Sequence, residues 1–170
     1  MSGEVSSTSP VLGTRFATTA RHHRQILERY KRIAIVGLSA NPYRPSHFVA
    51  LYMRAAGYQI FPVNPREREI VGRKCYASLA EVPQPLEIVD IFRESAAVPA
   101  IVEEAIAAHA KVIWMQLGVI HEPAAARALE AGLEVVMDRC VKIEHARFFG
   151  GLSTLGLNAG VISARFQSLP

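Results

Sequence analysis

The sequence lacks an apolar run long enough to span a membrane, although half of its 170 residues are hydrophobic and its mean hydropathy is +0.16. The apolar residues therefore predict a packed core, of a size that suits a single domain. The first residues also lack the basic, apolar and small-residue pattern of a secretory signal. We expect one domain without membrane association.

Cysteine is also scarce. Cys75 and Cys140 lie far apart and lack the spacing of metal ligands, which predicts two reduced thiols in a cytoplasmic protein and no metal site. The six histidines do not alter this view. His22 and His23 fall in a polar arm and the other four are isolated, so we expect solvated or capping side chains at all of them.

Charge of either sign is modest, since 19 Lys and Arg against 15 Asp and Glu give a net charge of +4. The arginines are scattered among predicted strand ends and turns, without a dense basic stripe or interleaved aromatic residues. This distribution suits a phosphorylated small molecule as the partner, and we expect no binding to nucleic acid.

Residues 33 to 57 carry the most informative pattern. The apolar residues 33 to 36 run into Gly37, and apolar positions at helical spacing follow Pro45. The pattern predicts a buried strand, a tight turn at Gly37, and a helix that Pro45 begins and Ser46 caps. Free N–H groups at the start of such a helix favour a phosphate, which makes the turn a candidate nucleotide site. A strand-helix turn without a ligand is the alternative.

Strand and helix patterns alternate along the rest of the chain. Strands are predicted at residues 32–38, 58–63, 87–92, 111–116 and 133–137. Helices are predicted within residues 16–30, 45–57, 97–109 and 123–131, with a short one at 77–81 in an otherwise irregular 66–86. The alternation predicts an α/β fold with a Rossmann-like, doubly wound parallel five-stranded sheet of strand order 3-2-1-4-5 and helices on both faces. The ligand crevice is expected at the carboxyl ends of the strands, where the order reverses.

The predicted domain organisation follows from composition. Residues 1–15 are rich in Ser and Thr and are expected to form a flexible arm, and residues 16–150 form the binding domain. Residues 151–170 form a Gly-rich C-terminal segment. A free tail, a docked segment and a dimer contact remain open for it.

The details of the turn exclude an NAD fingerprint. Ser39 stands where the second glycine of G-x-G-x-x-G belongs, and the second strand ends in Val63-Asn64-Pro65-Arg66, without the acidic residue that holds the ribose. Arg66, with Arg68 nearby, would instead complement a phosphate on the ribose. This leaves NADP or a 3′-phosphorylated nucleotide such as coenzyme A, with an ordinary solvated turn as the alternative.

Short motifs at the strand ends carry a family resemblance. They are Gly37-Leu38-Ser39, Arg44-Pro45-Ser46, Pro62-Val63-Asn64-Pro65, Asp90-Ile91-Phe92-Arg93, Trp114-Met115-Gln116-Leu117-Gly118 and Met137-Asp138-Arg139-Cys140-Val141-Lys142. As an ordered set, over about residues 20 to 165, they resemble the stand-alone coenzyme A-binding domain proteins. These proteins are similar to the nucleotide-binding domain of the succinyl-CoA synthetase α subunit.

The resemblance implies coenzyme A or an acyl-CoA as the ligand. It implies that the pyrophosphate and its surroundings meet Gly37, Ser39, Arg44 and Ser46, and that the adenosine end meets Val63, Asn64 and Pro65. It further implies that the cleft is walled by Phe92 and Arg93 and then by Gln116 and Gly118. Trp114 is expected in the core.

Cys140 and Lys142 are the remaining candidates for contact with the ligand, and the Cys140 thiol is the chemical candidate among them. Arg139 and Lys142 on either side would lower the pKa of its thiol, so a mixed disulfide with the coenzyme A thiol and a purely structural role are both open. No His or Asp partner stands at a motif-defined position, and no catalytic residue is assigned.

These observations predict non-catalytic binding of coenzyme A or an acyl-CoA, by a sensor, a carrier or a partner subunit. The phosphohistidine domain and the β subunit of the synthetase have no counterpart in the sequence, so ligase chemistry is not expected. The alternatives are an NADP-dependent oxidoreductase, which the absence of a Tyr-x-x-x-Lys pair weakens, and a nucleotide-controlled interaction protein. A homodimer or a partner protein is left open.

Overall fold

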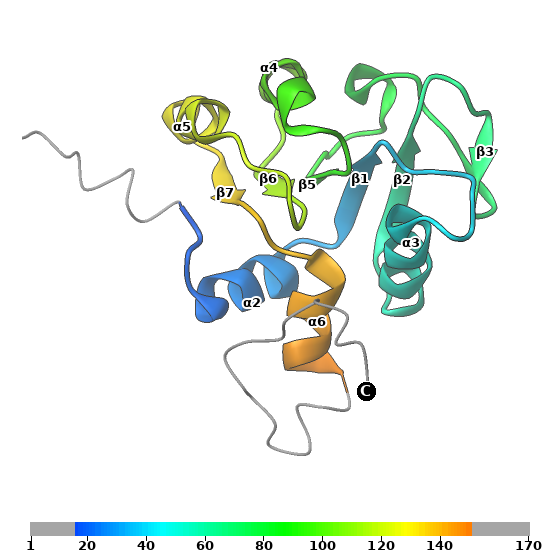
Figure 1. Cartoon of the computed structure of the whole chain (residues 1–170), viewed down its shortest axis with the longest axis horizontal. Helices are drawn as coiled ribbons and strands as arrows, with labels where there is room; N and C mark the ends of the chain where they lie inside the picture. The colour runs from blue at the N-terminus through cyan, green and yellow to red at the C-terminus, as the bar shows by residue number, and fades with distance from the viewer. Residues whose placement is uncertain (1–15, 151–170) are drawn as a thin grey trace, which may run out of the picture.

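The computed structural model describes residues 16–150 (Figure 1), so the expectations for residues 1–15 and 151–170 lie outside the described residues. The helices are α2 (Ala20–Arg29), α3 (Pro45–Ala55), α4 (Val98–Ala107), α5 (Glu122–Glu130) and α6 (Val141–Phe149), with short 3-10 turns η1 (Leu79–Glu81) and η2 (Ser95–Ala97). The strands are β1 (Arg32–Val36), β2 (Gln59–Val63), β3 (Glu69–Ile70), β4 (Arg73–Lys74), β5 (Ile88–Ile91), β6 (Val112–Met115) and β7 (Glu134–Val136).

Five of the strands form one parallel sheet, which confirms the Rossmann-like α/β fold. The predicted strand order is wrong, because the sheet runs β2-β1-β5-β6-β7. With the five strands numbered as in the prediction, the observed order is 2-1-3-4-5. The third strand therefore lies beside the first, and the second strand is at the edge. The burial pattern explains this order: all four residues of β5 are buried, whereas β2 contains Pro62, which has no N–H to donate to a second neighbour.

Helices cover both faces of the sheet, as predicted (Figure 1). On one face α4 and α5 pack over Ala34, Val89 and Ile113, and on the other α2, α3 and α6 pack over Ile33 and Trp114. Trp114 is fully buried, which confirms its place in the core, and its Nε1 donates to the carbonyl of Arg139 over 2.8 Å. The alternation of side chains along each strand separates the two cores.

Two elements escaped the sequence analysis. The segment 66–86 contains the antiparallel hairpin β3-β4, where only an irregular loop with one short helix was expected. Helix α6 was missed because its buried positions Val141, Glu144 and His145 include two ionisable residues, which hides the apolar periodicity. Phe148 and Phe149 are the last two residues of this helix.

The expectation for the histidines was wrong at two positions. His23 is 2% exposed and His145 is 8% exposed. His23 bonds to Glu144 on α6, and His145 Nδ1 lies 3.0 Å from the hydroxyl of Tyr52 on α3. These side chains therefore link helices on one face of the sheet. His121 does cap a helix, since its Nδ1 accepts the N–H of Ala124 at 3.1 Å.

No helix within residues 16–150 is long and apolar enough to cross a membrane. In the same range, no three His, Cys, Asp or Glu side chains gather as ligands for a metal ion.

Candidate functional site

The turn after β1 is held by hydrogen bonds from its own neighbours. Gly37, at φ +85°, donates its N–H to the carbonyl of Val63 over 3.0 Å. Ser39 donates its N–H to Ser46 Oγ over 3.1 Å, and its own hydroxyl accepts the N–H of Asn41 at 3.1 Å. Ser46 was expected to cap α3, but the N-cap position belongs to Arg44, and Ser46 instead fixes the turn.

The loops after β2 and β5 close against this turn. Asn64 donates its side-chain N–H to the carbonyl of Leu38 over 3.0 Å and accepts the N–H of Arg66 at 3.0 Å. Phe92 donates its N–H to the carbonyl of Val36 over 2.9 Å. Because parallel strands bring their carboxyl ends to one edge, three loops that are distant in sequence meet there.

These loops enclose a pocket of about 720 Å³, which we call the loop pocket. It is lined by Gly37, Ser39, Arg44, Pro45, Ser46, Asn64, Arg66, Phe92, Arg93 and Glu94. A smaller pocket of about 260 Å³, the side pocket, shares Gly37, Asn64 and Arg93 with it and is also lined by Val63, Pro65, Ala100 and Ile101 among others. Ten of the fourteen predicted residues therefore surround the two pockets: eight line the loop pocket, and Val63 and Pro65 line the side pocket.

The loop pocket is electropositive. Arg44, Arg66 and Arg93 are exposed, and none of the three makes an ion pair with another residue in the range 16–150. Glu94 is the single carboxylate in the lining. Guanidinium groups bind phosphate through paired, charge-assisted hydrogen bonds, so the arrangement suits a ligand with several negative charges.

Gln116 and Gly118 lie outside both pockets. Gln116 is 3% exposed and donates to Asp90 Oδ1, and Gly118 donates its N–H to Asp138 Oδ1 over 2.7 Å. The strand order explains their position. The order reverses between β1 and β5, so the crevice forms there and not beside β6, where the predicted order would have placed it.

Cys140 and Lys142 also lie outside both pockets. Cys140 occupies the N-cap position of α6. Burial raises the pKa of its thiol and the nearby Asp90 raises it further, and these effects outweigh the backbone N–H groups and Lys142, which lower it. The expectation of a lowered pKa was therefore wrong, since it considered only the neighbouring charges in sequence. A raised pKa makes the thiol a poor nucleophile.

The sequence analysis did not select Glu94, although it follows Arg93 directly in the loop after β5. Ala77 and Ser78 line the side pocket because the connection from β2 to β5 folds back over the strand ends. No local pattern marks them, since their place depends on tertiary packing.

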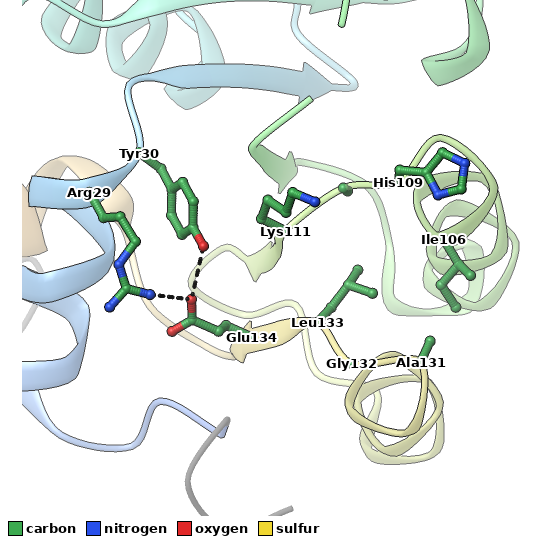
Figure 2. A pocket seen from close by; sticks show the side chains of 10 residues that line it. Arg29, Tyr30, Ile106, His109, Lys111, Ala131, Gly132, Leu133 and Glu134 are labelled. Carbon is green, nitrogen blue, oxygen red and sulfur yellow. Dashed lines mark hydrogen bonds and ion pairs between the residues drawn. The ribbon is translucent and has the colours of Figure 1, made fainter. Parts of the chain in front are cut away.

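A third pocket, of about 630 Å³, lies at the other end of the strands, beside the starts of β6 and β7 (Figure 2). Glu134, at the start of β7, is held there by His22 Nε2 at 2.7 Å, Arg29 at 3.2 Å and the Tyr30 hydroxyl at 3.4 Å. Figure 2 shows Lys111 between this group and His109. The Glu134 carboxylate therefore has its hydrogen-bond partners within the protein.

Comparison with known proteins identifies the family. The model of the CoA binding domain family matches residues 31–146. The chain belongs to the CoA binding domain family. The match covers β1 through most of α6 and so includes all three loops of the loop pocket.

Several relatives are similar to this CoA binding domain protein. The uncharacterized protein YneT of Bacillus subtilis is 46% identical over 123 residues, which are 72% of this chain and 91% of YneT. A hypothetical protein from Pyrococcus horikoshii OT3 is 42% identical, with a TM-score of 0.76 over 79% of this chain and 94% of that one. An ADP-forming acetate–CoA ligase of Methanocaldococcus jannaschii is 30% identical over 74 residues, which are 44% of this chain and 10% of the ligase.

Proposed function

We propose that the protein binds coenzyme A or an acyl-CoA in the loop pocket and does not itself transform it. The observation that carries the proposal is the convergence of three arginines, Arg44, Arg66 and Arg93, around the Gly37 turn at the strand-order reversal. Membership of the CoA binding domain family supports the choice of ligand.

The chemistry of coenzyme A fits the two pockets. Its pyrophosphate and 3′-phosphate carry the negative charges that three guanidinium groups would neutralise. Arg44 and Ser46 belong to the first turn of α3, where backbone N–H groups also favour a phosphate. The side pocket, with Val63, Ala100 and Ile101 in its lining, offers an apolar wall for the adenosine end.

The arrangement favours coenzyme A over a dinucleotide. Asn64 and Arg66 follow β2, where an NAD-binding fold needs an acidic residue for the ribose. In this proposal Arg66 binds the ribose phosphate, which both coenzyme A and NADP carry, so NADPH is the informative competitor.

Binding without catalysis is supported by what lines the loop pocket. A nucleophile and a base within hydrogen-bonding reach are required for covalent catalysis. The hydroxyls of Ser39 and Ser46 in the lining accept backbone N–H groups of the turn, and neither forms a hydrogen bond with Glu94 in the described range. The buried Asp90 and the thiol of Cys140 lie outside the pocket lining. A role as a sensor, a carrier or a partner subunit follows.

Isothermal titration calorimetry of the full chain with coenzyme A, dephospho-coenzyme A and NADPH tests the proposal. Coenzyme A should bind. Arg66→Ala should lower the affinity for coenzyme A by about tenfold, the effect of one charged hydrogen bond, and should change the affinity for dephospho-coenzyme A little. Ser39→Leu should abolish binding, because its side chain fills the turn. Arg68→Ala is the matched control, since Arg68 is exposed in the same loop but lines neither pocket.

Tighter binding of NADPH than of coenzyme A would reject the proposal and favour the oxidoreductase. Equal effects of Arg66→Ala and Arg68→Ala would show that the loop contributes only general charge.

A further inference from the structure

Helix α3 presents an apolar outer face. Its inner face, which includes Val49 and Met53, is buried against the sheet. A surface helix normally carries polar residues on the other side. Here Phe48 is 54% exposed and Leu51 is 38% exposed, and Tyr43, just before the helix, is 87% exposed.

The exposed residues form one stripe along the helix. Positions 44, 48, 51 and 55 are spaced by four, three and four residues, which places them on the same side of an α-helix. Ala55, at the last position, is also exposed. Figure 1 shows α3 at the outside of the molecule, beside β2. The three apolar members of the stripe, Phe48, Leu51 and Ala55, are neighbours on the exposed side of the helix, as in a surface that binds another protein.

The charge around this stripe has one sign. Arg44 begins it, and Arg54 flanks it on one side. The sequence contains no Asp or Glu from Asn41 to Arg66. Lys142 of α6 adds a further positive charge, with its Nζ 5.9 Å from the ring centre of Tyr52. A segment that covers the stripe would therefore be attracted if it carried acidic residues beside its apolar ones.

We propose that the outer face of α3, defined by Tyr43, Phe48 and Leu51 with Arg44 and Arg54, binds an acidic amphipathic segment of a partner protein. Phe48 and Leu51 supply the apolar anchors, and the arginines select the acidic flanks. This interaction goes beyond ligand binding in the loop pocket. The two sites share Arg44, whereas Phe48, Leu51 and Arg54 line neither pocket.

Other occupants fit less well. Two copies of α3 packed antiparallel about a two-fold axis would set Arg44 of one copy against Arg54 of the other, which is repulsive. The chain's own terminal segments offer little complementary charge, because residues 1–15 contain one acidic residue, Glu4, and residues 151–170 contain none.

The test uses the full ¹⁵N-labelled chain and two designed helical peptides that share a Leu and Phe stripe. One peptide carries Glu on both flanks of the stripe, and the other carries Lys at the same positions. The Glu peptide should shift the amide signals of residues 43–55 and bind saturably, with an affinity that falls as salt is added. The Lys peptide should not bind.

Phe48→Ser combined with Leu51→Ser should lower the affinity for the Glu peptide by at least about tenfold, because both anchors are lost. Leu117→Ser combined with Ile120→Ser is the matched control, since those side chains are similarly exposed, at 52% and 49%, in the loop after β6, away from α3. Thermal unfolding verifies that both double variants remain folded.

Equal binding of the two peptides, or unchanged binding by the Phe48 and Leu51 variant, would overturn the proposal. So would sedimentation showing a dimer of the unmodified chain that this variant dissociates, because the occupant would then be a second copy.

Discussion

Asp90 and Gln116 form a buried hydrogen bond between neighbouring strands, in which Gln116 Nε2 donates to Asp90 Oδ1 over 2.7 Å. Asp90 is fully buried, and its Oδ2 has no hydrogen-bond partner within residues 16–150. Burial raises the pKa of Asp90 to about 8, against the hydrogen bond from Gln116, which lowers it. The carboxyl group is therefore mostly protonated at neutral pH.

Replacing Asp90 with Asn should stabilise the fold at neutral and basic pH. In the unfolded chain the carboxyl has its ordinary pKa of 3.8, so from about pH 4 to about pH 8 the folded state holds one proton more. The free energy of unfolding then falls by up to about 1.4 kcal/mol per pH unit as the pH rises. Asp90→Asn removes this slope and keeps an acceptor for Gln116.

Urea unfolding of the two proteins across this pH range measures the difference. Glu130→Gln is the control, because Glu130 is exposed and should leave the slope unchanged. Parallel pH curves for Asp90→Asn and the unmodified protein would show that Asp90 is ionised in the fold.

The pair of His23 and Glu144 joins α2 to α6, and its loss should be costly. His23 Nδ1 lies 3.0 Å from Glu144 Oε2 and its Nε2 lies 2.8 Å from the carbonyl of Ala17. Both of these partner oxygens accept hydrogen bonds, so the ring is held from two sides. His23→Leu removes one of the two partners of Glu144 Oε2, since Arg147 Nη1 stays 3.3 Å from it. The loss of this buried hydrogen bond should lower the free energy of unfolding by about 1–3 kcal/mol.

Chemical denaturation compares this variant with Glu28→Gln, which breaks the exposed Arg24–Glu28 pair on the same helix. That control should cost less than about 1 kcal/mol. Burial works to raise the pKa of Glu144, but its hydrogen bond to His23 and the positive charges of His23 and Arg147 lower it. The stability from this carboxylate should therefore be lost on acidification, and similar costs for the two variants would contradict a buried charged pair.

The hairpin β3-β4 turns through Val71, at φ 51°, and Gly72, at φ 68°. A two-residue turn of this shape favours Asn before Gly, and a β-branched residue is strained there. Val71→Asn should relieve this strain and raise the free energy of unfolding by about 1 kcal/mol. The packing lost with the half-buried Val71 side chain makes the net gain smaller. Thermal unfolding checks this against Val71→Ala, which loses the packing without favouring the turn. No gain of Asn over Ala would mean that the turn is not strained.

The sequence predicted the positions of the strands and helices along the chain better than it predicted which strands are neighbours in the sheet. The apolar runs and turn residues are local signals, and they located the five parallel strands and the helices α2 to α5. Strand order depends on which edges remain free. Pro62 already indicated an edge for β2, and this conflicts with the predicted order, which placed that strand between two others.

The candidate site was predictable to the same extent. Residues immediately after β1, β2 and β5 gather at the loop pocket because parallel strands share a carboxyl edge. Gln116 was misplaced together with the strand order, and Cys140 was misjudged because burial, which sequence neighbours do not reveal, outweighs Lys142. Helix α6 was hidden by its buried ionisable residues, whose partners lie on other helices.

Substitutions at Gly37 and Gly118 should separate an effect on ligand affinity from an effect on stability. Both have a positive φ, +85° and +84°, so alanine should cost about 1–2 kcal/mol of stability at either position. Their surroundings differ. A Cβ on Gly37 would lie 2.7 Å from the Phe92 carbonyl oxygen and 2.7 Å from Arg93 Cδ, whereas a Cβ on Gly118 meets nothing within 4 Å.

Gly37→Ala should therefore displace Phe92 and Arg93, which line the loop pocket, and lower the affinity for coenzyme A by about tenfold or more. Gly118→Ala should keep the affinity while it shows the same conformational cost. Calorimetry with coenzyme A and thermal unfolding of both variants measure the two effects separately. If the affinity falls equally in both, the ligand also depends on the loop after β6, where the family resemblance implied a wall of the cleft at Gln116 and Gly118.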